Sequence, residues 1–184
     1  MIELRGKRVV LRTLERAHCR ELWDAYEPIE PSPTEPLNPG LSIEGADRWF
    51  EEMQARQGRE QVYLGIFTFD GRLVGDIQLA DINWRDRVAS LGVGISRRVD
   101  RGKGYASNAV RIMVHYGFAE LDLARIEART AAYNLGAQRL LEACGFRREG
   151  IRRQSIHRGG KRWDEITFGL LASEYAQGGS GDGD

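Results

Sequence analysis

Cysteine and histidine are scarce in this 184-residue chain, which has two cysteines and three histidines. Cys19 and Cys144 lack the close spacing of metal ligands, and the isolated histidines add no cluster, so we expect no metal site. A chain of this length can bury a core without disulfides or a structural metal. The sequence therefore predicts one domain, residues 1–176, followed by a disordered tail, residues 177–184, whose apolar content is too low to order it.

An excess of charge of either sign is also absent, because 27 basic residues balance 27 acidic ones. No whole-molecule field then favours nonspecific binding to DNA, RNA or an anionic membrane. The chain has no apolar run long enough to span a membrane, and its first residues lack the apolar stretch of a secretion signal. We therefore expect a cytoplasmic protein that binds neither nucleic acid nor membrane, and any anion site must be local.

Hydrophobic periodicity and turn residues predict an α/β or α+β domain built around one mixed sheet. Proline occurs only in residues 27–41, where it breaks regular structure and is typical of a functional loop. The pair Asp70-Gly71 is typical of a type I′ hairpin turn. We expect strands over residues 3–13, 61–69, 72–79, 89–96, 125–131, 147–157 and 162–171, and helices over residues 15–26, 43–56, from 104 onward, and 134–143.

The segment RGKGYASNA, residues 101–109, places two glycines at the start of a predicted helix. The first N–H groups of a helix have no partner within it and the helix dipole is positive there, so an anion fits naturally. Gly102 and Gly104 let this backbone approach an anion without a Cβ in the way. The spacing differs from that of a P-loop and of a dinucleotide-binding fingerprint. From spacing alone, phosphate binding and a purely structural turn remain equal alternatives.

The residues of this loop also match a longer pattern. Arg101-x-x-Gly104-x-Ala106 resembles the Arg/Gln-x-x-Gly-x-Gly/Ala signature of the GNAT superfamily, the Gcn5-related N-acetyltransferases. LGVGI, residues 91–95, is similar to the central strand that precedes the loop in that family, and NLGAQRLLEACGFRREG, residues 134–150, to the segment that follows it. The opening GKRVVLRTLERAHCRELW and the closing GGKRWDEITFGLLASEY resemble its RimJ/RimL-like branch. The resemblance covers residues 3–175 in the right order.

This resemblance implies transfer of an acetyl group from acetyl-CoA to a primary amine, by direct attack in a ternary complex. The amine is that of a protein N-terminus, a polyamine, an antibiotic or another small molecule, and a homodimer is expected. The family likeness also implies that the glycine loop holds the pyrophosphate, that pantetheine runs between two splayed strands, and that backbone N–H groups near Val93 and Ile95 polarise the thioester carbonyl. The expected cofactor-binding residues are Val93, Ile95, Arg97, Arg101, Gly102, Lys103, Gly104, Tyr105, Ala106, Ser107 and Asn134. Asn134 is equally suited to a simple helix N-cap.

The resemblance does not supply a general acid or base. Seven residues after Asn134, where many members have a tyrosine that protonates the leaving thiolate, the chain has Leu141, and three residues after Asn134 it has Ala137 in place of a serine. An amine must also lose a proton before or during attack, which usually involves a carboxylate or a water chain. Candidate carboxylates are Asp76, Asp81, Glu27, Glu30 and Glu35, of which Asp81 and Glu27 are the preferred hypotheses.

Two alternatives to an acetyltransferase follow from the same residues. Leu141 and Ala137 fit a protein that keeps acyl-CoA binding but has lost turnover, and that acts as a sensor or partner module. The arginine-rich strands fit transfer of a different acyl group, such as succinyl, whose carboxylate an arginine can pair. Among acceptors, the acidic residues within residues 27–35 favour a small cationic amine.

Overall fold

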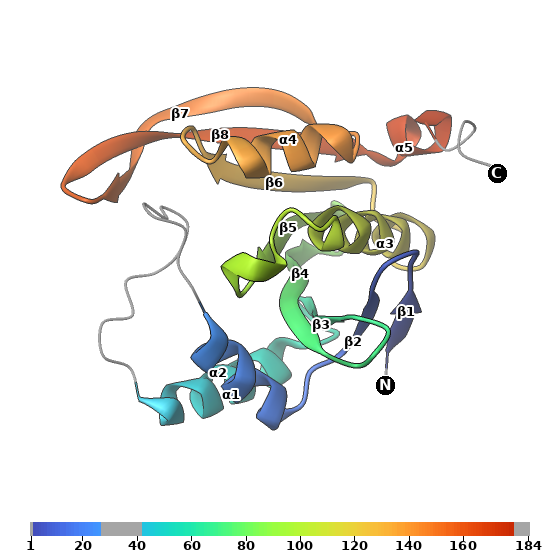
Figure 1. Cartoon of the computed structure of the whole chain (residues 1–184). Helices are drawn as coiled ribbons and strands as arrows, with labels where there is room; N and C mark the ends of the chain where they lie inside the picture. The colour runs from blue at the N-terminus through green and yellow to red at the C-terminus, as the bar shows by residue number, and fades with distance from the viewer. Residues whose placement is uncertain (1, 27–41, 179–184) are drawn as a thin grey trace.

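The computed structural model describes residues 2–26 and 42–178, which form one eight-stranded mixed sheet flanked by helices (Figure 1). The strand order is β1-β2-β3-β4-β5-β6-β8-β7, and only the β5–β6 pair is parallel. This confirms the predicted fold class. The elements in chain order are β1 (Glu3–Arg5), β2 (Val10–Thr13), α1 (Arg16–Ala25), α2 (Ile43–Arg56), β3 (Val62–Phe67), β4 (Leu73–Asn83), β5 (Val88–Ile95), the 3-10 helix η1 (Arg98–Asp100), α3 (Tyr105–Ala119), β6 (Arg125–Ala131), α4 (Leu135–Ala143), β7 (Arg147–Arg158), β8 (Lys161–Leu171) and α5 (Ala172–Gly178).

The two ends of the domain differ from the sequence prediction. The single strand expected over residues 3–13 is an antiparallel hairpin of β1 and β2, because the charged residues after Gly6 form a turn that the Gly6 N–H closes on the Val9 carbonyl at 2.9 Å. At the other end, α5 was not predicted, and it includes the first two residues of the expected tail. The rest of that tail, residues 179–184, and the proline-containing residues 27–41 lie outside the described residues.

The turn at Asp70-Gly71 is not the predicted type I′ turn. Only Gly71 of this pair has a positive φ, of 87°, and its N–H donates to the Thr68 carbonyl at 2.9 Å. A type I′ turn requires positive φ at both central residues, whereas a turn followed by one left-handed glycine gives a longer loop. The β7–β8 hairpin, by contrast, turns at Gly159 and Gly160, which both have positive φ.

Two layers of helix cover the two faces of the sheet. Helix α3 packs the buried Val110, Met113 and Val114 against one face. On the other face, α1 and α2 bury Leu22 and Met53 in a second, smaller cluster. The spacing of apolar residues along each amphipathic helix therefore places the helix with its apolar side on the sheet.

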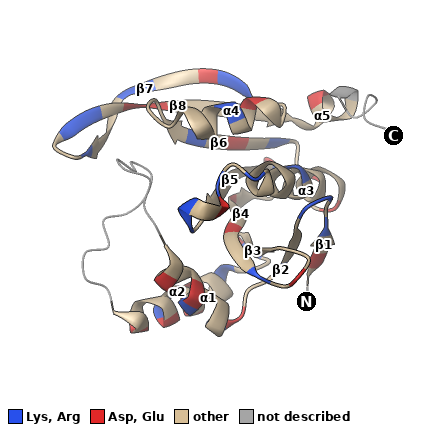
Figure 2. Ribbon diagram, in the orientation of Figure 1, with Lys and Arg blue, Asp and Glu red and all other residues tan. Residues whose placement is uncertain are grey.

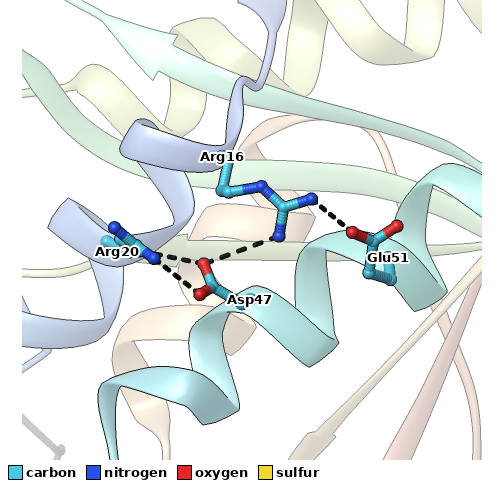
Figure 3. A network of polar contacts seen from close by, with 4 residues as sticks. All are labelled: Arg16, Arg20, Asp47 and Glu51. Atoms are coloured by element: carbon cyan, nitrogen blue, oxygen red, sulfur yellow. Dashed lines mark hydrogen bonds and ion pairs between the residues drawn. The ribbon is translucent and has the colours of Figure 1, made fainter.

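Helices α1 and α2 are joined by a network of four charged side chains (Figure 3). Arg20 of α1 donates to both carboxylate oxygens of Asp47 of α2, at 2.8 and 2.6 Å. Arg16 pairs with Asp47 at 3.6 Å and also with Glu51, one turn further along α2. Hydrogen bonding from Arg20 lowers the pKa of the Asp47 carboxyl. The network joins α1 to α2 on the exposed side of the two helices, in addition to their apolar packing against the sheet.

The sheet divides between β5 and β6. These two strands pair only from Val88 with Arg125 to Leu91 with Ala128, although β5 continues to Ile95 and β6 to Ala131. Figure 1 shows the consequence: β6, β7 and β8 with α4 form one half of the molecule, and β1 to β5 with α1 and α2 form the other. The two halves diverge at the centre of the fold, where the family likeness predicts the pantetheine.

Candidate functional site

The loop between β5 and α3 has the backbone of an anion site. Gly102 and Gly104 have φ of 75° and 80°, in the left-handed region that favours glycine, and Gly104 is the N-cap of α3. The Asn108 N–H donates to the Gly104 carbonyl at 3.1 Å as the first turn of the helix closes. The N–H groups just before Asn108 belong to the unpaired set at a helix start, where the dipole is also positive. The conformation therefore presents backbone donors to a phosphate-sized anion.

Two of the cations predicted at this loop, Arg101 and Lys103, have structural partners. The Arg101 guanidinium donates to the carbonyls of Ile95 and Ser96 at 3.2 and 3.3 Å, and its N–H donates to Arg98 at 3.0 Å. Arg101 therefore ties the end of β5 to the loop. Arg97 is exposed at the start of η1, where Figure 2 shows a concentration of basic residues.

Lys103 pairs with Asp100 at 3.2 Å. Asp100 is only 2% exposed and also accepts a hydrogen bond from Arg72 at 2.8 Å, which lowers the pKa of the Asp100 carboxyl. This buried carboxylate holds two cations beside the loop, and so fixes the loop against β4.

Arg8 lies against the loop and was missed by the sequence analysis. Its Cδ and Nε are each 3.5 Å from the position that a Cβ on Gly104 would occupy, and its Nη1 is 3.5 Å from the Lys103 carbonyl oxygen. The Asn108 side chain places it, because its Oδ1 accepts the N–H groups of Arg8 and Val9 at 2.9 and 3.1 Å. Arg8 and Asn108 are 100 residues apart in sequence, so no local pattern pointed to this pair.

The free edge of β5 carries the two backbone positions predicted to face the thioester. The Ser96 N–H donates to Val74 of β4 at 3.0 Å. Because backbone groups of a strand alternate in direction, the N–H groups of Val93 and Ile95 point away from β4, toward the side where β6 has diverged. The Ile95 carbonyl, on the same side of the strand, accepts a hydrogen bond from the Arg101 guanidinium. The Val93 and Ile95 N–H groups face the space between β5 and β6.

Asn134 and Ser107 have local structural roles in addition to any contact with a ligand. The Asn134 side chain caps α4 by accepting the Ala137 N–H at 3.1 Å. The Ser107 hydroxyl donates to the Gly104 carbonyl at 3.1 Å and so tightens the first turn of α3. Leu141 is buried in the core at 5% exposure, which accounts for an apolar residue at that position.

A cavity of about 430 Å³ lies on the opposite side of β4, under α2. Within the described part of the chain, the one cation that lines it is Arg56, which pairs with Glu60 at 2.9 Å and with Asp81 at 3.1 Å. The aromatic rings of Trp49 and Tyr63 meet edge to face in its wall, with centroids 5.8 Å apart. Its lining residues are Trp49, Glu52, Met53, Arg56, Gln61, Tyr63 and Gln78.

The two preferred carboxylate hypotheses have different outcomes. Asp81 lies where the β4–β5 register is irregular, has a φ of 51°, and its side chain is 76% exposed in the ion pair with Arg56. It is therefore paired with Arg56, one of the residues that line the cavity, and is not itself among them. Glu27 lies outside the described residues.

Asp76 is the carboxylate that the structure brings to the sheet face beside β5. Its Cα is opposite Gly94, and its Oδ2 accepts the Tyr63 hydroxyl at 2.7 Å. Burial raises the pKa of Asp76 from its ordinary 3.8 to about 6, an effect that the Tyr63 hydrogen bond partly offsets. Burial and the Asp76 charge raise the pKa of the Cys19 thiol to about 12, so Cys19 stays a neutral core residue.

Among the described residues, no group of three or more His, Cys, Asp or Glu side chains is placed to hold a metal ion. Within the same part of the chain, none of the helices has the length and apolar character needed to cross a membrane.

Comparison with known proteins places these features in a family. A sequence profile described as Acetyltransferase (GNAT) domain matches residues 8–147. The probable N-acetyltransferase YjcK of Bacillus subtilis (strain 168) is 32% identical over 95% of this chain and 99% of its own length. A chimera of the Vibrio cholerae spermidine N-acetyltransferase SpeG and hSSAT has the same fold, with a TM-score of 0.82, 24% identity, and coverage of 91% of this chain and 98% of its own. The Vibrio cholerae spermidine N-acetyltransferase in complex with CoA and spermine aligns with a TM-score of 0.75 and 23% identity over 91% of this chain and 98% of its own.

Proposed function

This chain belongs to the GNAT acetyltransferase family and is an acyltransferase with acetyl-CoA as its co-substrate, and we propose that its acceptor is the primary amino group of a small cationic amine, a class that includes the polyamines. The observation that carries the proposal is the charge of the cavity under α2. Arg56, the one cation among the described residues that line it, is already paired with Glu60 and Asp81, so Glu52 and the neighbouring Asp76 leave the site with negative charge. A cationic acceptor offsets that charge, and the Trp49 ring offers it a cation–π surface.

The residues of the chain fit acetyl-CoA at the places where the family likeness predicts it. We propose that the backbone of the loop from Arg101 to Ala106 holds the pyrophosphate, with Arg8 as a further cation beside it. This assignment is supported by the left-handed glycines 102 and 104 and by the unpaired donors at the α3 start. Bound there, acetyl-CoA supplies an activated acetyl group as a thioester. The N–H groups of Val93 and Ile95 then stabilise the negative charge that develops on the carbonyl oxygen.

The acceptor proposal is tested by incubating the protein with acetyl-CoA and a panel of amines, and measuring CoA thiol release. The panel contains spermidine, a short peptide with a free N-terminus, and an aminoglycoside. We expect the highest kcat/KM with spermidine. Faster turnover of the peptide would contradict the small cationic acceptor and favour a protein N-terminus.

The same assay separates the alternatives to acetyl transfer. Replacing acetyl-CoA by succinyl-CoA tests the second acyl group, and we expect acetyl-CoA to be preferred by roughly tenfold or more in kcat/KM. Tight binding of acetyl-CoA in isothermal titration together with no thiol release for any amine would instead favour the acyl-CoA sensor.

We further propose that the protein belongs to the RimJ/RimL-like branch, that its domain ends near residue 176, and that it is a cytoplasmic homodimer. The branch is supported by the opening and closing segments of the sequence. Sedimentation equilibrium across a range of protein concentrations tests the dimer, since a single monomer mass at all concentrations would exclude it.

A further inference from the structure

Two polar side chains of β4 lie next to glycines of the neighbouring strand β5. Asp76 is opposite Gly94 and Gln78 is opposite Gly92, and residues directly opposite in an antiparallel pair point to the same face. Asp76 Oδ1 is 3.5 Å from the position that a Cβ on Gly94 would occupy, and Gln78 Nε2 is 3.0 Å from the equivalent position on Gly92. Because β5 carries no side chain at either glycine, a carboxylate and an amide lie directly above the stretch of β5 that has separated from β6.

We propose that Asp76, held in place by the Tyr63 hydroxyl, receives the ammonium group of the acceptor beside Gly94 and takes its proton. The inference rests on the proposed function and names the proton acceptor for it. The carboxylate takes H⁺ from R–NH₃⁺ and becomes a carboxylic acid, and the neutral amine attacks the thioester carbon. The N–C bond forms, the C–S bond breaks, and the sulfur leaves with the electron pair of that bond. Two protons leave the nitrogen in all, one to Asp76 and one as the new amide forms. One of the two protonates the sulfur to CoA–SH and the other passes to the solvent.

The surroundings of Asp76 are suited to a cationic ligand. Among the described residues, the pKa of Asp76 is affected by burial and by the Tyr63 hydrogen bond. Asp76 takes part in none of the ion pairs that these residues form. Asp76 is half-buried, and withdrawing a carboxylate from water without a cation is costly. The ammonium group of an acceptor would give Asp76 the cationic partner that it lacks among the described residues. The groups that face Asp76 are Tyr63 from β3, the neutral Cys19 from α1 and the Gly94 backbone from β5.

Two residues that line the cavity under α2 are also neighbours of Asp76. Tyr63 and Gln78 line the cavity, and Tyr63 donates to Asp76 while Gln78 is its next neighbour on the same face of β4. The organic part of the acceptor therefore lies against Trp49, and its amino group reaches the sheet at Asp76. A carboxylate whose pKa is raised toward 6 is also a stronger base than an ordinary one and is ionised at neutral pH.

The decisive variant is Asp76→Asn, which keeps the shape and can still accept the Tyr63 hydrogen bond but cannot take a proton. We expect kcat/KM for spermidine to fall by roughly 100-fold to 10,000-fold, with the acetyl-CoA dissociation constant unchanged. In the wild-type protein kcat/KM should rise with pH through a midpoint near the Asp76 pKa of about 6, and this limb should be lost in the variant. The matched control is Asp122→Asn, because Asp122 is an exposed surface residue paired with Arg87 and its φ of 51° suits asparagine.

Tyr63→Phe tests the positioning role of the hydroxyl and serves if Asp76→Asn does not fold. Since the Tyr63 hydrogen bond lowers the Asp76 pKa, its loss should move the midpoint of the limb to higher pH while activity above it remains. A readout without acetyl-CoA is the isothermal titration of spermidine, whose binding should weaken in Asp76→Asn and not in Asp122→Asn.

The outcomes separate this inference from the proposed function. A wild-type protein that acetylates spermidine, with full activity and an unchanged pH profile in Asp76→Asn, overturns the role of Asp76 alone. Loss of activity in Asp81→Asn with none in Asp76→Asn would assign the proton to Asp81. A wild-type protein that releases no thiol with any amine overturns the proposed function and this inference with it.

Discussion

The two sides of β5 are built in different ways. On the α3 side, the candidate cofactor loop is one contiguous stretch, residues 101–107, and its donors are backbone groups oriented by two left-handed glycines. On the α2 side, the candidate acceptor site is made of side chains from α2, β3 and β4, which the α1–α2 ion pairs and the sheet bring together. A backbone site depends on a few φ angles, whereas a side-chain site can change its ligand without any change of fold.

The largest effect expected on the cofactor side is that of Gly104→Asp. The new carboxylate would face the pyrophosphate, and like charges in contact cost several kcal/mol, so acetyl-CoA affinity should fall by roughly 100-fold or more. Isothermal titration with acetyl-CoA measures the change. Gly71→Asp is the matched control, since Gly71 has a similar φ of 87° against 80° for Gly104 but lies in a remote turn. Equal affinities in the two variants would mean that the loop does not hold the cofactor.

On the acceptor side, Asp76→Asn should stabilise the fold while it removes activity. The Asp76 pKa is about 6 in the folded chain against an ordinary 3.8, so folding favours the protonated form. Asp76 therefore does not lower the free energy of unfolding below pH 3.8, lowers it increasingly as pH rises to about 6, and lowers it by the full amount above that pH. The difference between the two pKa values makes this full loss of unfolding free energy roughly 3 kcal/mol. Urea unfolding of both proteins should show the variant more stable at pH 8, with the advantage shrinking toward pH 4; a constant difference would contradict the buried charge.

The contrast between the two sides also decides what the sequence alone could predict. The glycine loop and the bounds of α2 and β6 follow from local patterns, and the structure has them where the sequence places them. Asp76 was one of five candidate carboxylates, and the sequence favoured Asp81 and Glu27 over it, because strand pairing is what places Asp76 opposite Gly94 and beside Tyr63. Arg8 had no local signal at all. Contacts between distant segments are set by tertiary packing, which a residue pattern does not encode.

A smaller effect, on stability, is expected at Asn108, which joins α3 to the backbone just before β2. Asn108→Ala removes the acceptor of the Arg8 and Val9 N–H groups, at 2.9 and 3.1 Å. The Arg8 N–H is exposed and water can replace its acceptor, but leaving the partly buried Val9 N–H unpaired costs about 1–3 kcal/mol of unfolding free energy. Thermal or urea unfolding measures the loss, and Asn108→Asp, which keeps an acceptor oxygen, should recover most of it. If both variants were equally destabilised, the packing of the side chain rather than its hydrogen bonds would be responsible.

The smallest effect tests whether a side chain contributes to the backbone site at all. Arg8 lies within 3.5 Å of the Cβ position of Gly104 but is exposed, so a contact from its guanidinium to a phosphate is screened by solvent. We expect Arg8→Ala to weaken acetyl-CoA binding by about threefold to tenfold at low salt and by less at high salt, because exposed ion pairs are worth only about 1 kcal/mol. Arg5→Ala is the matched control, because Arg5 is an exposed arginine of the same hairpin that pairs with Glu3. A loss as large as that of Gly104→Asp would mean that the cofactor side depends on side chains as much as the acceptor side does.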